Sequence, residues 1–98
     1  MSEPDGKADE VRLTAWVHGQ VQGVGFRWWT RSRAPELGLT GYAANCPDGR
    51  VQIVAQGPRD ACEQLLQLLQ SGKTPGHVDN VVAEWSPRGE PFSGFSER

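Results

Sequence analysis

A strand-like segment that runs directly into a glycine-rich loop and then a helix-like segment constrains this fold more than any other feature. Residues 11–18 alternate apolar and polar side chains, the period of a β-strand, with one face made of Val11, Leu13, Ala15 and Val17. The next seven residues read GQVQGVG and contain no acid. A helical spacing then predicts an inner face of Phe26, Thr30, Ala34 and Leu37. Since Pro35 removes a backbone donor, we expect this helix to kink or loosen before Gly38.

The remaining elements follow from turn signals and apolar runs. Residues 42–46 and 50–56 flank Pro47-Asp48-Gly49 and predict a hairpin. After Pro58, a second helix ends at residues 71–72 and has a wide apolar face of Ala61, Cys62, Leu65, Leu66, Leu68 and Leu69. Residues 78–85 favour a strand, and the segment PFSGF near residue 95 favours a short edge strand.

The predicted order is β-α-β-β-α-β with a fifth strand as an addition. This order predicts a ferredoxin-like α+β sandwich, in which two helices lie on one face of a largely antiparallel sheet of four or five strands. With 98 residues, of which 37% are hydrophobic, the chain has enough apolar side chains for one core. We therefore expect a disordered N-terminal tail at residues 1–10, which has four acids and one base, and a single domain at residues 11–98.

Charge and hydropathy exclude several classes of partner. The net charge is -2, and residues 11–98 keep eight acids and nine bases, so the domain is not a strongly basic binder of nucleic acid. No segment approaches the roughly 20 apolar residues of a membrane-spanning helix, and the polar, acidic N-terminus does not resemble a signal peptide. We expect a cytoplasmic protein that binds neither nucleic acid nor membrane.

Cysteine and histidine are too few and too dispersed to suggest a metal site. Cys46 and Cys62 are expected to be reduced and buried. They are far in sequence from each other and from His18 and His77, with no spacing typical of metal ligands. The sequence predicts neither a metal nor a cofactor.

The glycine-rich loop has the features of an anion-binding site. A loop that opens a helix presents unpaired main-chain N–H groups at the positive end of the helix dipole. Gly23 and Gly25 let the backbone curl around a ligand, and Arg27 adds a charge-assisted contact to a phosphate. Because no Gly-Lys-Ser/Thr follows, and Trp28 stands where a dinucleotide fingerprint needs glycine, nucleotide sites are disfavoured.

Two long motifs identify a resemblance. Residues 17–27, VHGQVQGVGFR, are similar to the first acylphosphatase signature, V-x-G-x-V-Q-G-V-x-F-R, at every fixed position. The second signature of that family, G-[aromatic]-x-x-N-x-x-x-G-x-V-x-x-x-x-x-G, is matched by Gly41, Tyr42, Asn45, Gly49, Val51 and Gly57. The resemblance implies an enzyme that hydrolyses the carboxyl-phosphate bond of acyl phosphates to carboxylate and inorganic phosphate, with a positioned water and without covalent intermediate, metal or cofactor.

The resemblance also implies which residues act. Arg27 is expected to bind the phosphoryl oxygens, and Asn45 to position the attacking water. The main-chain donors of the phosphate-binding loop are expected to be those of Gln22, Gly23, Val24, Gly25 and Phe26. Strand alternation places Cys46 on the face opposite Asn45, which makes it a core thiol instead of a nucleophile. Of the adjacent Trp28 and Trp29, one is expected to pack under the helix and the other to lie at the surface.

Other functions are compatible with the predicted fold. An RNA-binding domain of similar architecture would carry aromatic side chains on its third strand, whereas residues 51–55, VQIVA, have none. A second alternative is a sensor of a phosphorylated metabolite, or the acylphosphatase-like part of a protein that processes carbamoyl phosphate. Since the chain ends at Arg98, we expect a free-standing monomeric hydrolase whose partners are a small acyl phosphate and inorganic phosphate.

Overall fold

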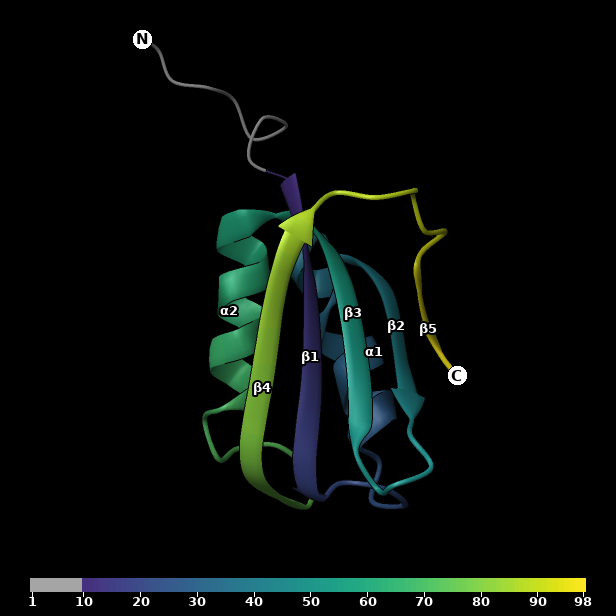
Figure 1. Cartoon of the computed structure of the whole chain (residues 1–98), viewed down its shortest axis with the longest axis vertical. Helices are drawn as coiled ribbons and strands as arrows, with labels where there is room; N and C mark the ends of the chain where they lie inside the picture. Colours follow the sequence, from purple (N-terminus) through teal and green to yellow (C-terminus); the bar gives the residue numbers. More distant parts are fainter. Residues whose placement is uncertain (1–9) are drawn as a thin grey trace, which may run out of the picture.

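The computed structural model describes residues 10–98. Within this range two α-helices cover one face of a five-stranded sheet whose strand order is β4-β1-β3-β2-β5 (Figure 1). The ferredoxin-like prediction is confirmed. The elements in chain order are β1 (Glu10–Gln20), α1 (Phe26–Arg33), the short 3-10 helix η2 (Pro35–Leu37), β2 (Thr40–Asn45), β3 (Val51–Pro58), α2 (Arg59–Leu69), β4 (His77–Pro87) and β5 (Phe95–Glu97). The predicted disordered tail falls on residues outside the described ones, except Glu10, which begins β1.

Strand β1 is an interior strand of the sheet and pairs antiparallel with both β3 and β4. The alternation in its sequence is the reason for its two faces: Leu13, Ala15 and Val17 are fully buried beneath the helices, whereas Arg12 and Trp16 lie on the open face. The same helix-covered face carries Ala43 of β2 and Ile53 of β3, both fully buried. The core therefore lies between the sheet and the helices, as the alternation predicts.

Helix α1 is short because proline ends it. Phe26, Thr30 and Ala34 are buried along the predicted inner face. The α-helix stops at Arg33, and the chain continues as η2 before Gly38 takes a left-handed conformation with φ of 79°. The predicted loosening before Gly38 is thus confirmed as a change from α-helix to 3-10 helix.

Helix α2 packs its apolar face on β1 and β3. Cys62, Leu65 and Leu69 are fully buried, as the predicted face requires. Burial raises the pKa of the Cys62 thiol to about 11, since an ionised sulfur loses its hydration there. Cys62 is therefore an inert packing residue.

The predicted fifth strand forms as the short edge strand β5, which pairs parallel with β2 in the register Gly41–Phe95 and Ala43–Glu97. Phe95 packs against the core, so Phe95 and Glu97 share the helix-covered face. The strand is shorter and later than the segment PFSGF suggests, since only Phe95 of that segment belongs to it.

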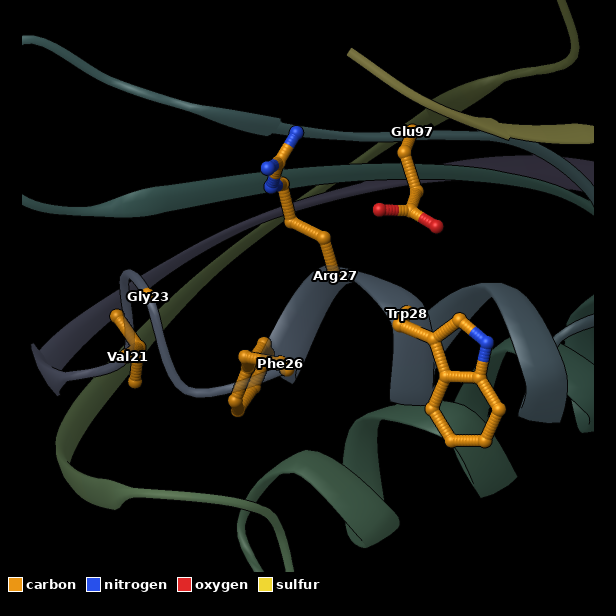
Figure 2. Close-up of a pocket in the computed structure, with 7 residues that line it drawn as sticks. Val21, Gly23, Phe26, Arg27, Trp28 and Glu97 are labelled. Atoms are coloured by element: carbon orange, nitrogen blue, oxygen red, sulfur yellow. The ribbon is translucent and has the colours of Figure 1, made fainter.

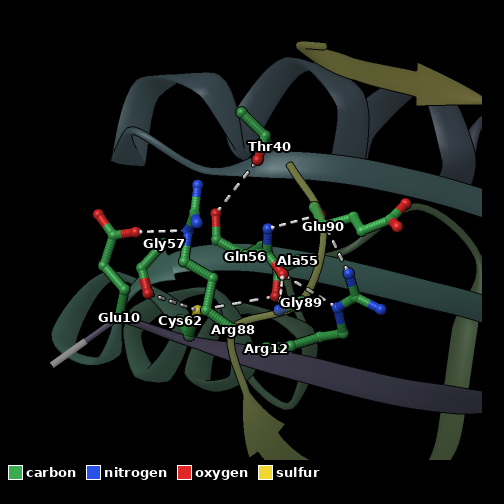
Figure 3. A network of polar contacts seen from close by, with 10 residues as sticks. All are labelled: Glu10, Arg12, Thr40, Ala55, Gln56, Gly57, Cys62, Arg88, Gly89 and Glu90. Atoms are coloured by element: carbon green, nitrogen blue, oxygen red, sulfur yellow. Dashed lines mark hydrogen bonds and ion pairs between the residues drawn. The ribbon is translucent and has the colours of Figure 1, made fainter. Parts of the chain in front are cut away.

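A buried glutamine anchors the connection from β4 to β5 (Figure 3). Gln56 is 3% exposed, and its Oε1 accepts hydrogen bonds from Arg12 Nε at 3.0 Å and from Gly89 N at 2.9 Å. Its Nε2 donates to the main-chain oxygen of Glu90 at 3.1 Å. Because every polar group of the side chain is engaged, this residue stabilises the connection at little desolvation cost. Among residues 10–98, neither helix has the length and apolar character that a membrane-spanning helix needs.

Candidate active site

The glycine-rich loop between β1 and α1 leaves its main-chain donors open. Gly23 and Gly25 have φ values of 75° and 86°, the left-handed conformation that glycine adopts without a Cβ penalty. A Cβ built on either residue would meet no atom within 4 Å, so the space above the loop is empty. No atom of residues 10–98 accepts a main-chain hydrogen bond from residues 23–28, and the first bond of α1 runs from Trp29 N to Gly25 O at 2.9 Å.

Gln22 fixes the loop against the β2–β3 hairpin. Its side-chain Nε2 donates to the main-chain oxygens of Cys46 and Arg50, at 2.8 and 2.9 Å. The sequence motif pointed to the main chain of Gln22 as a donor, whereas the structure gives its side chain this separate tethering contact. Sequence reasoning missed it because the contacts join residues 24 and 28 positions apart.

Contacts between Asp48 and Arg50 stabilise the turn of the β2–β3 hairpin. Asp48 Oδ1 accepts a hydrogen bond from Arg50 N at 3.1 Å, and Asp48 Oδ2 lies 2.7 Å from Arg50 Nε. These contacts with Arg50 lower the pKa of the Asp48 carboxyl. Asp48 is thus a turn residue, and its charge is directed to its neighbour in the turn.

Arg27 and Asn45 meet at one oxygen atom. Arg27, the second residue of α1, donates from Nη1 to the main-chain oxygen of Arg98 at 2.8 Å. The main-chain N–H of Asn45, the last residue of β2, donates to the same oxygen at 3.4 Å. Gly41, Ala43 and Asn45 are every second residue of β2 and therefore share one face of the strand. Gly41 and Ala43 face the helices, so the side chain of Asn45 lies on the same side of the sheet as α1. The structure therefore brings the two predicted residues together.

Arg98 is a supporting residue that the sequence did not reveal. Its main-chain N–H donates to Ala43 O at 2.7 Å, and its guanidinium stacks over the ring of Tyr42 at 3.9 Å. These contacts fix the position of the oxygen that accepts the hydrogen bond from Arg27. Since a guanidinium has five N–H donors, this contact leaves others free for a ligand.

A cleft of about 80 Å³ opens beside the loop (Figure 2). Its walls include Gly23 and Gly25 of the loop, Arg27 and Trp28 of α1, and Glu97 of β5. Trp28 is 61% exposed, while Trp29 stacks against Phe26 with ring centroids 5.9 Å apart, as expected for adjacent tryptophans on a helix. Glu97 was not singled out from the sequence, because only the pairing of β5 with β2 places it here.

The prediction that Cys46 is a buried strand residue was wrong. Strand β2 ends at Asn45, and Cys46 follows it at the start of the turn and is half-buried. Both cysteines are free. No group of three or more His, Cys, Asp or Glu side chains in residues 10–98 is arranged to hold a metal ion.

Comparison with known proteins gives concordant results. A family model described as acylphosphatase matches residues 13–97. The chain is 70% identical to an acylphosphatase of Mycobacterium tuberculosis and 65% identical to one of Mycolicibacterium smegmatis, each over 98 residues and the full length of both chains. Among solved structures, an acylphosphatase from Coxiella burnetii superposes with a TM-score of 0.86 at 36% identity, covering 98% of this chain and 100% of the other.

Proposed function

This chain belongs to the acylphosphatase family and is therefore a hydrolase of acyl phosphates. From this premise we propose that its glycine-rich loop and Arg27 bind the phosphoryl group while Asn45 positions the attacking water. The observation that carries this assignment is the shared contact of Arg27 and Asn45 with the oxygen of Arg98. Two residues from distant parts of the sequence thereby meet beside an open array of main-chain donors.

The phosphoryl group is bound by the loop. Main-chain N–H groups of residues 22–26 and the N-terminus of α1 supply donors and a positive dipole, which favour a dianion. Gln22 keeps the loop against the hairpin, so these donors are preorganised before substrate binds. Arg27 adds charge-assisted hydrogen bonds to the non-bridging oxygens.

The attacking water is held by the side-chain amide of Asn45. An amide both donates and accepts, so it can fix the position of a water and the direction of its lone pair. It also adds no negative charge beside a dianion, unlike a carboxylate. The exposed position of Asn45 at the end of β2 leaves its side chain accessible to solvent that enters the site.

The proposed reaction is a single displacement at phosphorus. The water oxygen bonds to phosphorus while the bond from phosphorus to the carboxyl oxygen breaks, and the carboxylate leaves with the electron pair. The water proton passes to a phosphoryl oxygen, which makes the substrate its own base. Because a carboxylate is a good leaving group, positioning and charge stabilisation suffice, and neither a covalent intermediate nor a metal takes part.

An isotope experiment tests this mechanism directly. Benzoyl phosphate is hydrolysed in heavy-oxygen water, with a chelator present, under single-turnover conditions. Attack at phosphorus places the heavy oxygen in inorganic phosphate and none in benzoate. Label in benzoate would contradict attack at phosphorus, and phosphate binding without turnover would indicate a sensor instead of an enzyme. A Cys46→Ser variant that loses all turnover would point to a thiol nucleophile.

The proposal extends to the state of the protein in the cell. We expect a monomeric, cytoplasmic enzyme whose ligands are a small acyl phosphate and inorganic phosphate, with no nucleic-acid partner. Sedimentation of the full chain at several concentrations tests the monomer, and a mass that rises with concentration would contradict it. Fluorescence titration with short RNA tests the expectation that the protein has no nucleic-acid partner, and saturable binding would contradict it.

A further inference from the structure

One carboxylate lines the cleft that we assign to the phosphoryl group. Glu97 of β5 stands opposite the loop, and Figure 2 shows its carboxyl group beside Arg27 and above the first turn of α1. Arg27 and Glu97 are the two charged residues of the lining. An acid at an anion site works against binding of the dianion, so its presence calls for a role other than holding phosphate.

The position of Glu97 follows from the sheet. Glu97 pairs with Ala43 of β2, two residues before Asn45 on the same helix-covered face. Its Oε2 lies 3.5 Å from Arg31 Nη1 across the gap to α1. The side chain is 29% exposed, against 56% for that of Arg31. The carboxylate is thus held beside Arg27, across the cleft from the glycines of the loop.

The size of the cleft decides which part of the substrate meets Glu97. Pockets that enclose a whole small-molecule ligand typically measure about 300 Å³ or more. A cleft of about 80 Å³ holds the phosphoryl end alone. The acyl group must therefore extend beyond the rim, where the wall opposite the loop is formed by Trp28 and Glu97.

We propose that Glu97 is a specificity-determining residue on the acyl side of the site, which selects against acyl groups that carry a negative charge and favours neutral or cationic ones. This inference rests on the proposed function. At a separation of about 8 Å and an effective dielectric constant of about 20 to 80, repulsion between two carboxylates lowers kcat/KM by roughly 2-fold to 30-fold. Because Arg31 partly compensates Glu97, we expect about 3-fold to 10-fold.

The test uses two substrates that differ by one charge, benzoyl phosphate and 4-carboxybenzoyl phosphate. For the wild type we expect kcat/KM to be higher for the neutral substrate, and Glu97→Gln to shrink that ratio by about 3-fold to 10-fold. The change should appear in KM with kcat retained, since the remote carboxylate is repelled equally in ground and transition states. Glu36→Gln is the matched control, because that carboxylate also pairs with an arginine of α1 but does not line the cleft.

A second measurement needs no variant. Salt screens repulsion between partly exposed charges, so the wild-type ratio should fall as sodium chloride rises from about 0.02 M to about 0.5 M. A ratio that is unchanged both by Glu97→Gln and by salt overturns the role of Glu97 while benzoyl phosphate hydrolysis still supports the proposed function. A wild type that hydrolyses neither substrate overturns the proposed function itself, and this inference with it. An equal shift in Glu36→Gln would assign the effect to net charge and overturn the inference.

Discussion

The side-chain amide of Gln22 donates to the main-chain oxygen of Cys46 across 2.8 Å and joins the glycine-rich loop to the turn of the β2–β3 hairpin. The same nitrogen donates to Arg50 O at 2.9 Å. The proposed phosphate-binding loop and the turn that follows Asn45 are therefore joined by a single side chain. In the proposed mechanism this tether orients the site without contact to a reacting atom.

Replacing Gln22 by alanine should uncouple the loop from the hairpin. We expect kcat/KM for benzoyl phosphate to fall by roughly 10-fold to 100-fold, since small displacements of binding groups are costly in catalysis. The free energy of unfolding should fall by about 1 to 2 kcal/mol, because two carbonyl groups each lose one of their two donors. Steady-state kinetics and urea unfolding measure both effects. Gln20→Ala, at the exposed end of β1, is the control, and wild-type kcat/KM in Gln22→Ala would contradict the tether.

Gln56→Leu should separate stability from activity. Arg12 Nε and Gly89 N lose their acceptor, and Glu90 O keeps only its contact with Arg12 Nη2, so we expect the free energy of unfolding to fall by about 2 to 3 kcal/mol. The network lies opposite the start of β1, whereas the loop follows its end, so kcat/KM should change by less than about threefold. Gln52→Leu on the same open face should change stability by at most about 0.5 kcal/mol. Equal losses in the two variants would argue against the network.

Cys62 should make stability fall at alkaline pH. Burial raises its pKa to about 11 in the folded protein from an ordinary value of 9.0, so the unfolded chain releases this proton first. The free energy of unfolding therefore holds below pH 9 and declines between about pH 9 and 11, by at most about 3 kcal/mol. Urea unfolding across this range measures the slope. A Cys62→Ala variant should lose that part of the decline, and an identical slope in both proteins would contradict the account.

Asn45→Ala should impair turnover more than binding. We expect kcat to fall by roughly 100-fold or more, since a preorganised hydrogen-bonding group at the reacting centre is lost. The inhibition constant of inorganic phosphate should stay within about threefold, because the loop and Arg27 remain. The main-chain contact of residue 45 with Arg98 is kept in this variant, so the fold is undisturbed. A variant with wild-type kcat would exclude the water-positioning role.

Local patterns in the sequence were sufficient to predict the helices and strands. Three patterns depend only on residues close together in the sequence. They are the alternation in β1, the spacing of Phe26, Thr30 and Ala34, and the hairpin turn. The spacing of the motifs selected Arg27 and Asn45, which both contact the oxygen of Arg98 and whose roles in the reaction stay predictions. These predictions needed no knowledge of how the strands pair.

The features that the sequence did not reveal depend on pairing between distant segments. Glu97 reaches the cleft because β5 adds to β2, and a three-residue edge strand has too weak a pattern to fix that register in advance. The oxygen of Arg98 contacts Arg27 across 71 positions. The burial of Cys46 was overestimated because the predicted strand was extended one residue past the end of β2, into a turn that contacts between Asp48 and Arg50 stabilise.

The most direct test of the central claim is a phosphate titration followed by proton–nitrogen correlation spectra of the main chain. In the wild type, we expect the amide signals of residues 22–27 to shift and saturate together as inorganic phosphate is added, because these N–H groups become donors to the ligand. In Arg27→Ala the same signals should need far more phosphate, since the charge-assisted contact is lost. Saturating shifts confined to other parts of the sheet, or equal affinity in Arg27→Ala, would contradict the assignment.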